Sequence, residues 1–288
     1  MIIIRLKGGL GNQMFQYALS LTFEEMGRMV KFDVTELTRR CEHNGLELGK
    51  VFPDLPIKIA TRDDLLSFFK RKFNTDDNRY NYSFHEGKTG FQEDSAFGFE
   101  PDLINLDNVY LAGYWQNVRY FEKYRQQLLD RFQFRDIEEY DTINILTKRM
   151  IMDSQAVSIH IRRGDYLYNS FYLSLPKVYY TEAISLVMQY VDTPDFFVFS
   201  DDIPYAKSLI SEKHTHFITT NRGSDSYKDM LLMSLCKVNI IANSTFSWWA
   251  SWLNKNSDHL MISPSQWFTQ DRNLVGFDPQ SNFIKVNI

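Results

Sequence analysis

The sequence has few cysteines and no long hydrophobic segment, and both absences narrow the kind of protein it encodes. Its 288 residues contain two cysteines, Cys41 and Cys236, which lie too far apart for a metal-binding spacing. So few cysteines favour a reducing compartment over a disulfide scaffold. The apolar stretch 2–6 is too short for a secretory signal, and no run approaches the roughly 20 apolar residues of a membrane-spanning helix. We therefore expect a cytoplasmic protein, with peripheral association at the inner face of the membrane left open.

The sequence also lacks a large excess of charge of either sign. Lysine and arginine number 32 against 36 acidic residues, so no general positive field predicts nucleic acid as a partner. The six histidines show no metal-ligand spacing, and neither Gly-x-Ser-x-Gly nor His-Glu-x-x-His occurs. We therefore expect a site that needs no metal and no cofactor. The 44% hydrophobic and 15% aromatic content is enough for one large core or two ordinary ones.

In the N-terminal half, the hydrophobic pattern predicts the opening of an α/β unit. An apolar stretch over 2–6 is typical of a buried strand, and the glycine turn 8–12 leads into a helix over about 13–26. A second strand over 30–34 gives the order strand, glycine turn, helix, strand, which requires a parallel sheet with a crossover helix. Residues 70–108 show no steady period, and we expect them to form loops.

The C-terminal half repeats this alternation more regularly. After a strand at 109–113, we expect strands at 157–161, 196–199, 217–219 and 238–242, alternating with helices at about 142–152, 177–191, 204–212, 226–236 and 247–253. An acid-rich stretch over 135–141 suggests a boundary between an N-terminal domain, 1–150, and a C-terminal domain, 151–288. The economical model is an α/β protein with two doubly wound layers facing a cleft. Because ligands bind outside the carboxyl ends of parallel strands, the loops at those ends are the candidate site.

A basic loop follows the strand at 157–161. His160, Arg162, Arg163 and Asp165 leave the end of this strand together. The planar fork of arginine suits paired contacts to phosphate oxygens, and its charge can neutralise a departing diphosphate. The alternative is an exposed strand end with an ordinary ion pair, but the position at a carboxyl end favours function.

The glycine turn after the first strand is a second candidate anion site. Glycines allow close approach of the backbone, and the following helix offers unpaired N–H groups. A dinucleotide-binding oxidoreductase using NAD(P) or flavin is an alternative, because Asp33 ends the next strand where such enzymes bind a ribose. Against it, Met14 occupies the position where the third small residue of that fingerprint should pack on the sheet.

Hydroxyls and carboxylates end the remaining strands. Asn243, Ser244 and Thr245 stand before an aromatic helix, where the same groups can cap the helix or bind phosphate. Asp201 and Asp229 could each accept N–H bonds from the edge of guanine. Acids in the first turn of a helix are also favoured by the helix dipole, which is the stronger alternative for Asp229.

Three segments together resemble the bacterial α-1,2-fucosyltransferases of glycosyltransferase family 11: Gly8-Gly-Leu-Gly-Asn-Gln-Met-Phe-Gln-Tyr-Ala18, His160-Ile-Arg-Arg-Gly-Asp-Tyr166 and Ile241-Ala-Asn-Ser-Thr-Phe-Ser-Trp-Trp249. The likeness extends to 113–116 and 227–230, and so spans nearly the whole chain apart from 70–108, where we expect acceptor choice to vary. It implies a GT-B architecture of two Rossmann-like domains. The N-terminal domain would serve the acceptor, and the C-terminal domain would bind GDP-fucose.

The same resemblance implies roles for individual residues. Arg162 would grip the β-phosphate, with His160 and Arg163 assisting or orienting it. The donor-binding set would be Gly9, Gly11, Asn12, Gln13, Arg162, Arg163, Asp201, Asp229, Asn243, Ser244, Thr245 and Phe246, with Asp229 as the acid that meets guanine. The acceptor-binding set would be Tyr114, Trp115 and Gln116.

The expected reaction is an inverting, metal-independent transfer of L-fucose from GDP-β-L-fucose to the 2-hydroxyl of a terminal galactose. The partners would be GDP-fucose and a galactose-terminated or lipid-linked glycan, as in surface-polysaccharide synthesis. In related α-1,6 enzymes a glutamate follows the basic motif, but 166–172 contains no acid. Asp165 is then the nearest candidate base, unless stabilisation of the leaving group dominates. A non-catalytic module that binds a sugar nucleotide or glycan is a further alternative.

Overall fold

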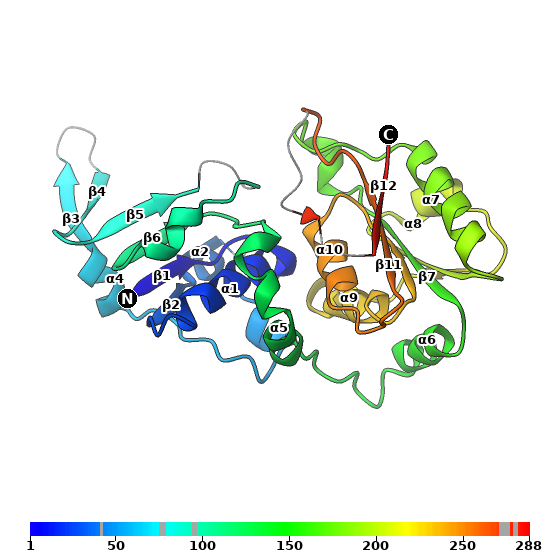
Figure 1. The fold of residues 1–288 in the computed structure, drawn as a ribbon, viewed down its shortest axis with the longest axis horizontal. Coiled ribbons are helices and arrows are strands. Elements are labelled where there is room, and N and C mark those ends of the chain that lie inside the picture. Colours follow the sequence, from blue (N-terminus) through cyan, green and yellow to red (C-terminus); the bar gives the residue numbers. More distant parts are fainter. Residues whose placement is uncertain (41–42, 75–78, 94–96, 271–276, 279–281) are drawn as a thin grey trace. The chain divides into compact units, whose positions relative to one another are not determined.

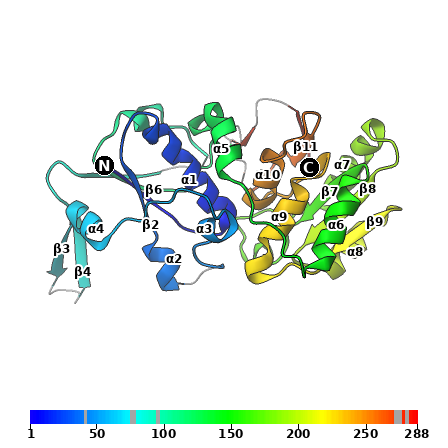
Figure 2. The ribbon, with the colours of Figure 1, turned by 90° about the horizontal axis from the view of Figure 1, so that it is seen from below.

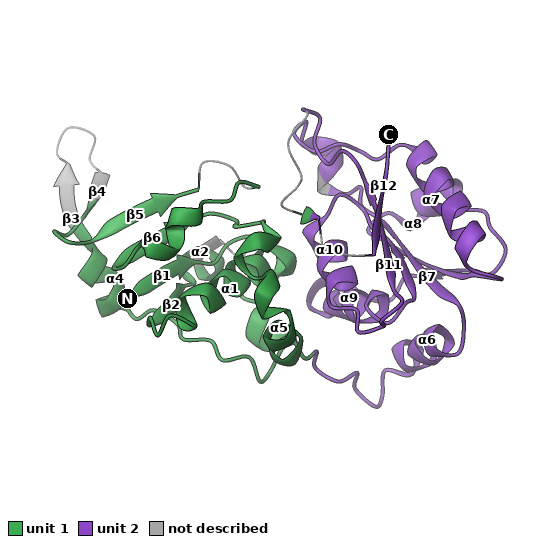
Figure 3. Cartoon of the chain, in the orientation of Figure 1, with its two compact units in different colours: residues 1–133, 275–277 green, residues 134–274, 278–288 purple. Residues whose placement is uncertain are grey.

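The computed structural model describes residues 1–40, 43–74, 79–93, 97–270, 277–278 and 282–288. The chain forms two compact units, one of residues 1–133 with 275–277 and one of 134–274 with 278–288 (Figure 3). Helix α6 (Thr142–Met152) belongs to unit 2, because it packs on α9 (Tyr227–Met233) and β7 (Ala156–Ile161). This corrects the predicted boundary after residue 150, which separated α6 from the sheet that it covers.

Unit 1 is built on four parallel strands in the order β2-β1-β6-β5 (Figure 1). Its elements are β1 (Ile2–Arg5), α1 (Leu10–Glu24), β2 (Val30–Asp33), α2 (Thr35–Arg40), α3 (Leu48–Val51), α4 (Arg62–Phe68), β3 (Phe69–Asn74), β4 (Arg79–Phe84), β5 (Thr89–Gln92), β6 (Val109–Ala112) and α5 (Arg125–Arg131), with short 3-10 turns at Pro101–Asn105, Val118–Tyr120 and Glu122–Tyr124. Strand β1 is apolar throughout Ile2–Ile4 because it is central and buried on both faces, as parallel strands are.

The segment predicted as loops, 70–108, contains three strands. Strands β3 and β4 form an antiparallel pair, and β5 adds a fourth parallel strand to the sheet beside β6. Phe69 packs against Phe84 across the pair and against Tyr110 of β6, with ring centroids 4.9 Å apart in both contacts. The loop prediction was wrong because aromatic residues alternate with polar ones over 79–84, and that pattern has the period of a strand.

Unit 2 is a six-stranded parallel sheet in the order β12-β11-β10-β7-β8-β9. Its elements are α6, β7, α7 (Lys177–Tyr190), β8 (Asp195–Ser200), α8 (Ile203–Leu209), β9 (Thr215–Ile218), α9, β10 (Val238–Ile240), α10 (Thr245–Trp252), β11 (Leu260–Pro264) and β12 (Phe283–Val286), with 3-10 turns at Asp165–Tyr168 and Gly223–Asp225. All six residues of β7 are buried. Helix α9 packs against α6 and α10, on the left of unit 2 in Figure 1 and along its lower side in Figure 2.

The predicted strands and helices of unit 2 are present, with ends that differ by a few residues. Strands β11 and β12 were missed, and they extend the sheet by two strands beyond β10. None of the helices in the described ranges is long and apolar enough to cross a membrane. The order of the strands places the ends of β10, β7, β8 and β9 side by side at one edge, as the sequence predicts for a ligand site.

Candidate active site

The two arginines after β7 are held by two acids after β8, the neighbouring strand. Arg162 Nη1 lies 2.8 Å from Asp201 Oδ2, and Arg163 Nη1 donates to Asp202 Oδ2 at 2.9 Å. The backbone N–H of Arg163 also donates to Asp201 Oδ1 at 2.9 Å, and the Arg163 guanidinium stacks on Tyr205 at 3.8 Å. Asp201 was predicted to bind the donor. In the structure both of its oxygens contact the basic loop and position it, and its contact with the donor stays a prediction.

A glycine makes this arrangement possible. A Cβ atom on Gly164 would lie 2.8 Å from Asp201 Oδ2, which is closer than such atoms approach in proteins. A larger residue at this position would require the Asp201 carboxylate, which contacts Arg162, to shift. The side chain of Asp165, the predicted general base, lies outside the described residues, so its role stays a prediction.

His160 is buried at the end of β7, where its ring lies 6.0 Å from that of Phe246. Burial, together with the positive charge of Arg162, lowers the pKa of His160 to about 3. The imidazole is therefore neutral at physiological pH and adds no positive charge to the site. Within the described part of the chain, its Nδ1 atom has no hydrogen-bond partner, although it is buried. Buried polar atoms are rarely left unpaired, so this atom is suited to contact a ligand.

The loop after β10 combines structural and accessible groups. Asn243 is buried and donates through Nδ2 to the carbonyls of Leu173 and Trp267, at 2.7 and 2.8 Å. It therefore ties two loops together, while its Oδ1 atom is buried without a hydrogen-bond partner among the described residues, so its place in the donor set stays a prediction. Ser244 caps α10 through Phe246 N at 3.3 Å. Thr245 and Phe246 are half-buried, so a ligand can reach them.

Tyr166 joins this loop to the basic loop. Its hydroxyl donates to the carbonyl of Asn243 at 2.9 Å. Its ring stacks on Tyr172 with centroids 4.2 Å apart, and the Arg162 guanidinium lies 5.6 Å from the same ring. Sequence reasoning missed this residue, although it is the last position of the basic motif. The two loops predicted to bind diphosphate are therefore connected directly within unit 2.

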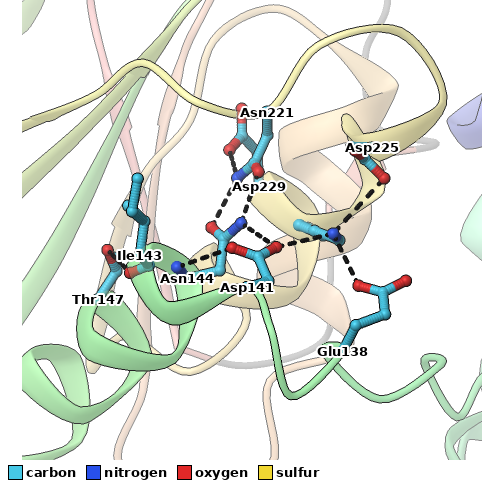
Figure 4. Close-up of polar contacts among 9 residues, drawn as sticks. Glu138, Asp141, Ile143, Asn144, Thr147, Asn221, Asp225 and Asp229 are labelled. Carbon is cyan, nitrogen blue, oxygen red and sulfur yellow. Dashed lines mark hydrogen bonds and ion pairs between the residues drawn. The ribbon is translucent and has the colours of Figure 1, made fainter.

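Asp229 lies at the start of α9 and is half-buried. Its Oδ1 atom accepts a hydrogen bond from Asn221 Nδ2 at 2.7 Å (Figure 4). Burial raises the pKa of Asp229 to about 7, against the opposing effects of the Asn221 hydrogen bond and the charge of Arg222. A carboxylate with this perturbed pKa, at the edge that carries the arginines, is a candidate ligand-binding group.

In unit 1, the glycine turn and the loop after β6 meet at the carboxyl edge of the sheet. Gly8 has φ +76°, and a Cβ atom there would lie 2.6 Å from Asn12 Nδ2. Asn12 Oδ1 in turn accepts from Gln116 Nε2 at 2.7 Å, and Lys7 Nζ lies 3.9 Å from the centre of the Tyr114 ring. The half-buried Gly9 lies in this turn, and the buried Gly11 in the first turn of α1. Predicted donor and acceptor groups therefore lie side by side here.

Two predicted residues of unit 1 are parts of its core. Gln13 is fully buried, donates to the carbonyls of Gly8 and Gly45, and accepts from Glu47 N. Trp115 is also fully buried and packs against other aromatic rings. Both side chains are buried in the structure, so their predicted contacts with donor and acceptor stay predictions.

Glu93 was missed by the sequence analysis. It follows β5 and accepts hydrogen bonds from the backbone N–H groups of Tyr114 and Trp115 at 2.6 and 3.0 Å. Burial raises its pKa, although these two hydrogen bonds oppose the shift. Glu93 therefore braces the loop that carries Tyr114 and Gln116. Recognising it required recognising β5, whose strand pattern was read as loop.

Two parallel α/β sheets, with paired arginines at the carboxyl edge of the second, define a glycosyltransferase of the GT-B architecture. A model of glycosyl transferase family 11 matches residues 1–285, and the chain belongs to this family. It is 30% identical to an α-1,2-colitosyltransferase of Escherichia coli over 96% of both chains. It is 29% identical to the O-antigen biosynthesis glycosyltransferase WbnK of Escherichia coli, over 91% of this chain and 93% of that one.

Among solved structures, the α-1,6-fucosyltransferase NodZ soaked with GDP-fucose has a similar fold. The superposition covers 88% of this chain and 91% of the NodZ chain, with a TM-score of 0.50. At 15% identity, this likeness concerns the fold. The family assignment overturns the oxidoreductase hypothesis. The structure gives a local reason as well, since Asp33 already accepts hydrogen bonds from Tyr110 and Thr35.

Proposed function

We propose that the protein transfers L-fucose from GDP-β-L-fucose to the 2-hydroxyl of a terminal galactose, with inversion and without a metal ion. The observation that carries the proposal is the basic loop after β7, where Asp201 holds Arg162 in place. A guanidinium fixed at a sheet edge can meet a diphosphate without first reorganising, which makes its charge effective in the transition state. The three sequence motifs, which resemble those of α-1,2-fucosyltransferases, support fucose as the sugar.

The donor would bind to unit 2. Arg162 would contact the diphosphate, Ser244, Thr245 and Phe246 would line the nucleotide, and Asp229 would accept the N–H groups of guanine. The acceptor would bind to unit 1, at Tyr114 and Gln116 beside Asn12. Its natural form would be a galactose-terminated or lipid-linked glycan of the kind used in O-antigen synthesis.

Transfer would occur in one displacement. The galactose hydroxyl forms a bond to the anomeric carbon while the bond from that carbon to the phosphate oxygen breaks, and GDP leaves with both electrons. Arg162 stabilises the charge that develops on the leaving diphosphate. His160, neutral and buried, would orient the phosphate by a hydrogen bond. The hydroxyl proton would pass to Asp165 or to water.

The test is to incubate the purified protein with labelled GDP-fucose and lactose in the presence of EDTA, and to analyse the linkage of the product. We expect a 2-linked fucosyl-galactose. Arg162→Ala should lose at least about a hundredfold in kcat/KM, since removing one group that stabilises developing charge costs that much in comparable sites. The matched control is Arg149→Ala, an exposed arginine of unit 2, which should keep full activity. Full activity of Arg162→Ala would refute the site.

A second donor is favoured by one observation, the 30% identity to an α-1,2-colitosyltransferase. Colitose differs from fucose by lacking the 3-hydroxyl, so a site that accepts one sugar has the right size for the other. A direct competition between GDP-fucose and GDP-colitose distinguishes the two. A preference for GDP-colitose would replace the sugar in the proposal and leave the diphosphate and guanine contacts unchanged.

A further inference from the structure

Two asparagines from distant parts of unit 2 form a reciprocal pair of hydrogen bonds (Figure 4). Asn144 of α6 donates to Asn221 Oδ1 at 2.8 Å, and Asn221 donates back to Asn144 Oδ1 at 3.0 Å. Each amide has one further N–H. That of Asn144 reaches Asp141 Oδ2 at 2.7 Å, and that of Asn221 reaches Asp229 Oδ1 at 2.7 Å. Both amides are buried, so every N–H of the pair is used in one fixed orientation.

The carboxylates at the two ends of this pair have different surroundings. Asp141 accepts from the buried Lys228 at 2.8 Å, and Lys228 also lies 2.9 Å from Glu138 and 3.5 Å from Asp225. Burial by itself would lower the pKa of Lys228, but its bonds to Asp141 and Glu138 raise that pKa above the ordinary value. The Asp141 end is therefore a charged, closed cluster.

Asp229, at the other end, forms no ion pair with any described residue, and its one hydrogen bond within the described ranges comes from the neutral Asn221. Its second oxygen, Oδ2, receives no hydrogen bond from that part of the chain. A carboxylate whose charge is left for a ligand, yet whose plane is fixed by an amide, is prepared for a partner with N–H donors. Guanine offers two such donors side by side, its N1–H and its 2-amino group.

We infer that Asn144 and Asn221 are positioning residues that orient the Asp229 carboxylate toward the paired N–H donors of guanine. This inference rests on the proposed function, in which Asp229 meets the base. The pair acts through Asp229 and touches no ligand itself. The position of the asparagine pair is fixed by Asp141. Lys228 of helix α9 forms an ion pair with Asp141, which lies near the start of unit 2.

The test measures the affinities of the full-length protein for GDP and for inosine diphosphate, which lacks the 2-amino group. Wild type should prefer GDP by about tenfold, the size of one hydrogen bond to a charged group. Asn221→Ala should weaken GDP binding by about tenfold and bring the preference close to one, because the carboxylate is no longer oriented. In an Asp229→Asn background, Asn221→Ala should change neither quantity further.

The matched control is Asn254→Ala, which removes another buried amide of unit 2 that donates to Cys236 O. It should lower stability and leave the preference for GDP unchanged. If Asn221→Ala does not fold, Asn144→Ala provides the test, with the same loss of preference expected, since it removes the brace behind Asn221.

The outcomes separate the two ideas. Wild-type affinity and preference in Asn221→Ala, with both lost in Asp229→Asn, would overturn the positioning inference and leave the guanine contact standing. Wild-type affinity and preference in Asp229→Asn would refute the guanine contact of the proposed function, and the positioning inference with it.

Discussion

Replacing Asp229 with asparagine should stabilise the folded protein while it weakens donor binding by about tenfold. Asparagine has nearly the same shape, and its carbonyl oxygen can still accept from Asn221 Nδ2. The substitution removes a charge that is half-buried and has no ion-pair partner among the described residues. Removing such a charge relieves a desolvation cost that the folded state bears and the unfolded state does not.

The magnitude follows from the pKa of Asp229, which burial raises from 3.8 to about 7. At 1.36 kcal/mol per unit, this rise corresponds to about 4 kcal/mol as an upper limit, and solvent screening of a half-buried group reduces it to about 2 kcal/mol. The folded pKa is the higher one, so the stabilisation from protonated Asp229 is complete below pH 3.8 and is lost as the pH rises to about 7. The variant should therefore gain most at pH 8 and almost nothing near pH 4.

Urea unfolding at several pH values measures this difference through tryptophan fluorescence. Four of the five tryptophans, Trp248, Trp249, Trp252 and Trp267, belong to unit 2, so the signal reports mainly on the unit that contains Asp229. GDP titration of the same samples should show the weakened binding at pH 8. A variant that is no more stable than wild type at pH 8, or whose gain does not shrink toward pH 4, would refute the reasoning.

Two further substitutions test the loops. Gly164→Ala should lower the affinity for GDP by about tenfold or more, because its Cβ would lie 2.8 Å from Asp201 Oδ2 and displace the contact that holds Arg162. Isothermal titration measures this affinity, and an unchanged value would contradict the reasoning. Asn243→Ala should cost about 2 kcal/mol of unfolding free energy, because it leaves the carbonyls of Leu173 and Trp267 without their donor. GDP titration of the folded fraction then tests the predicted donor contact of Asn243: a loss of affinity would support it, and wild-type affinity would count against it.

The sequence predicts the strands that carry the candidate site, because each of them follows from a local hydrophobic pattern. Strand β7 is buried at all six positions, four of them apolar, and the arginines follow it directly, so their place at the carboxyl edge could be deduced. Strand β5 could not be predicted, since its Thr-Gly-Phe-Gln sequence is short and largely exposed. Because β5 was missed, Glu93, which follows it and supports the predicted acceptor loop, was missed as well.

The roles of motif residues could not be predicted, because each depends on partners that the local sequence does not contain. Gln13 and Asn243 belong to the most recognisable motifs, yet both are buried amides whose hydrogens bind backbone carbonyls of other loops. A motif of this kind specifies the shape of a loop as much as the contacts that the loop makes. The side chains with accessible surface in the same motifs, Asn12 and Arg162, are the ones left to meet a ligand.

Asp201 and Asp229 illustrate how the same residue type, at the same edge of one sheet, acquires opposite functions. Asp201 contacts a guanidinium and a backbone N–H, so its charge fixes in place a cation that can meet the diphosphate. Asp229 is held by Asn221, which pairs with Asn144, 77 residues before Asn221 in the chain, and neutral amides orient a carboxylate without cancelling its charge. Because orientation and neutralisation are separated in this way, one edge can present positive charge to a diphosphate and negative charge to a base. An ion pair at Asp229 as well would have left the base without a complementary partner.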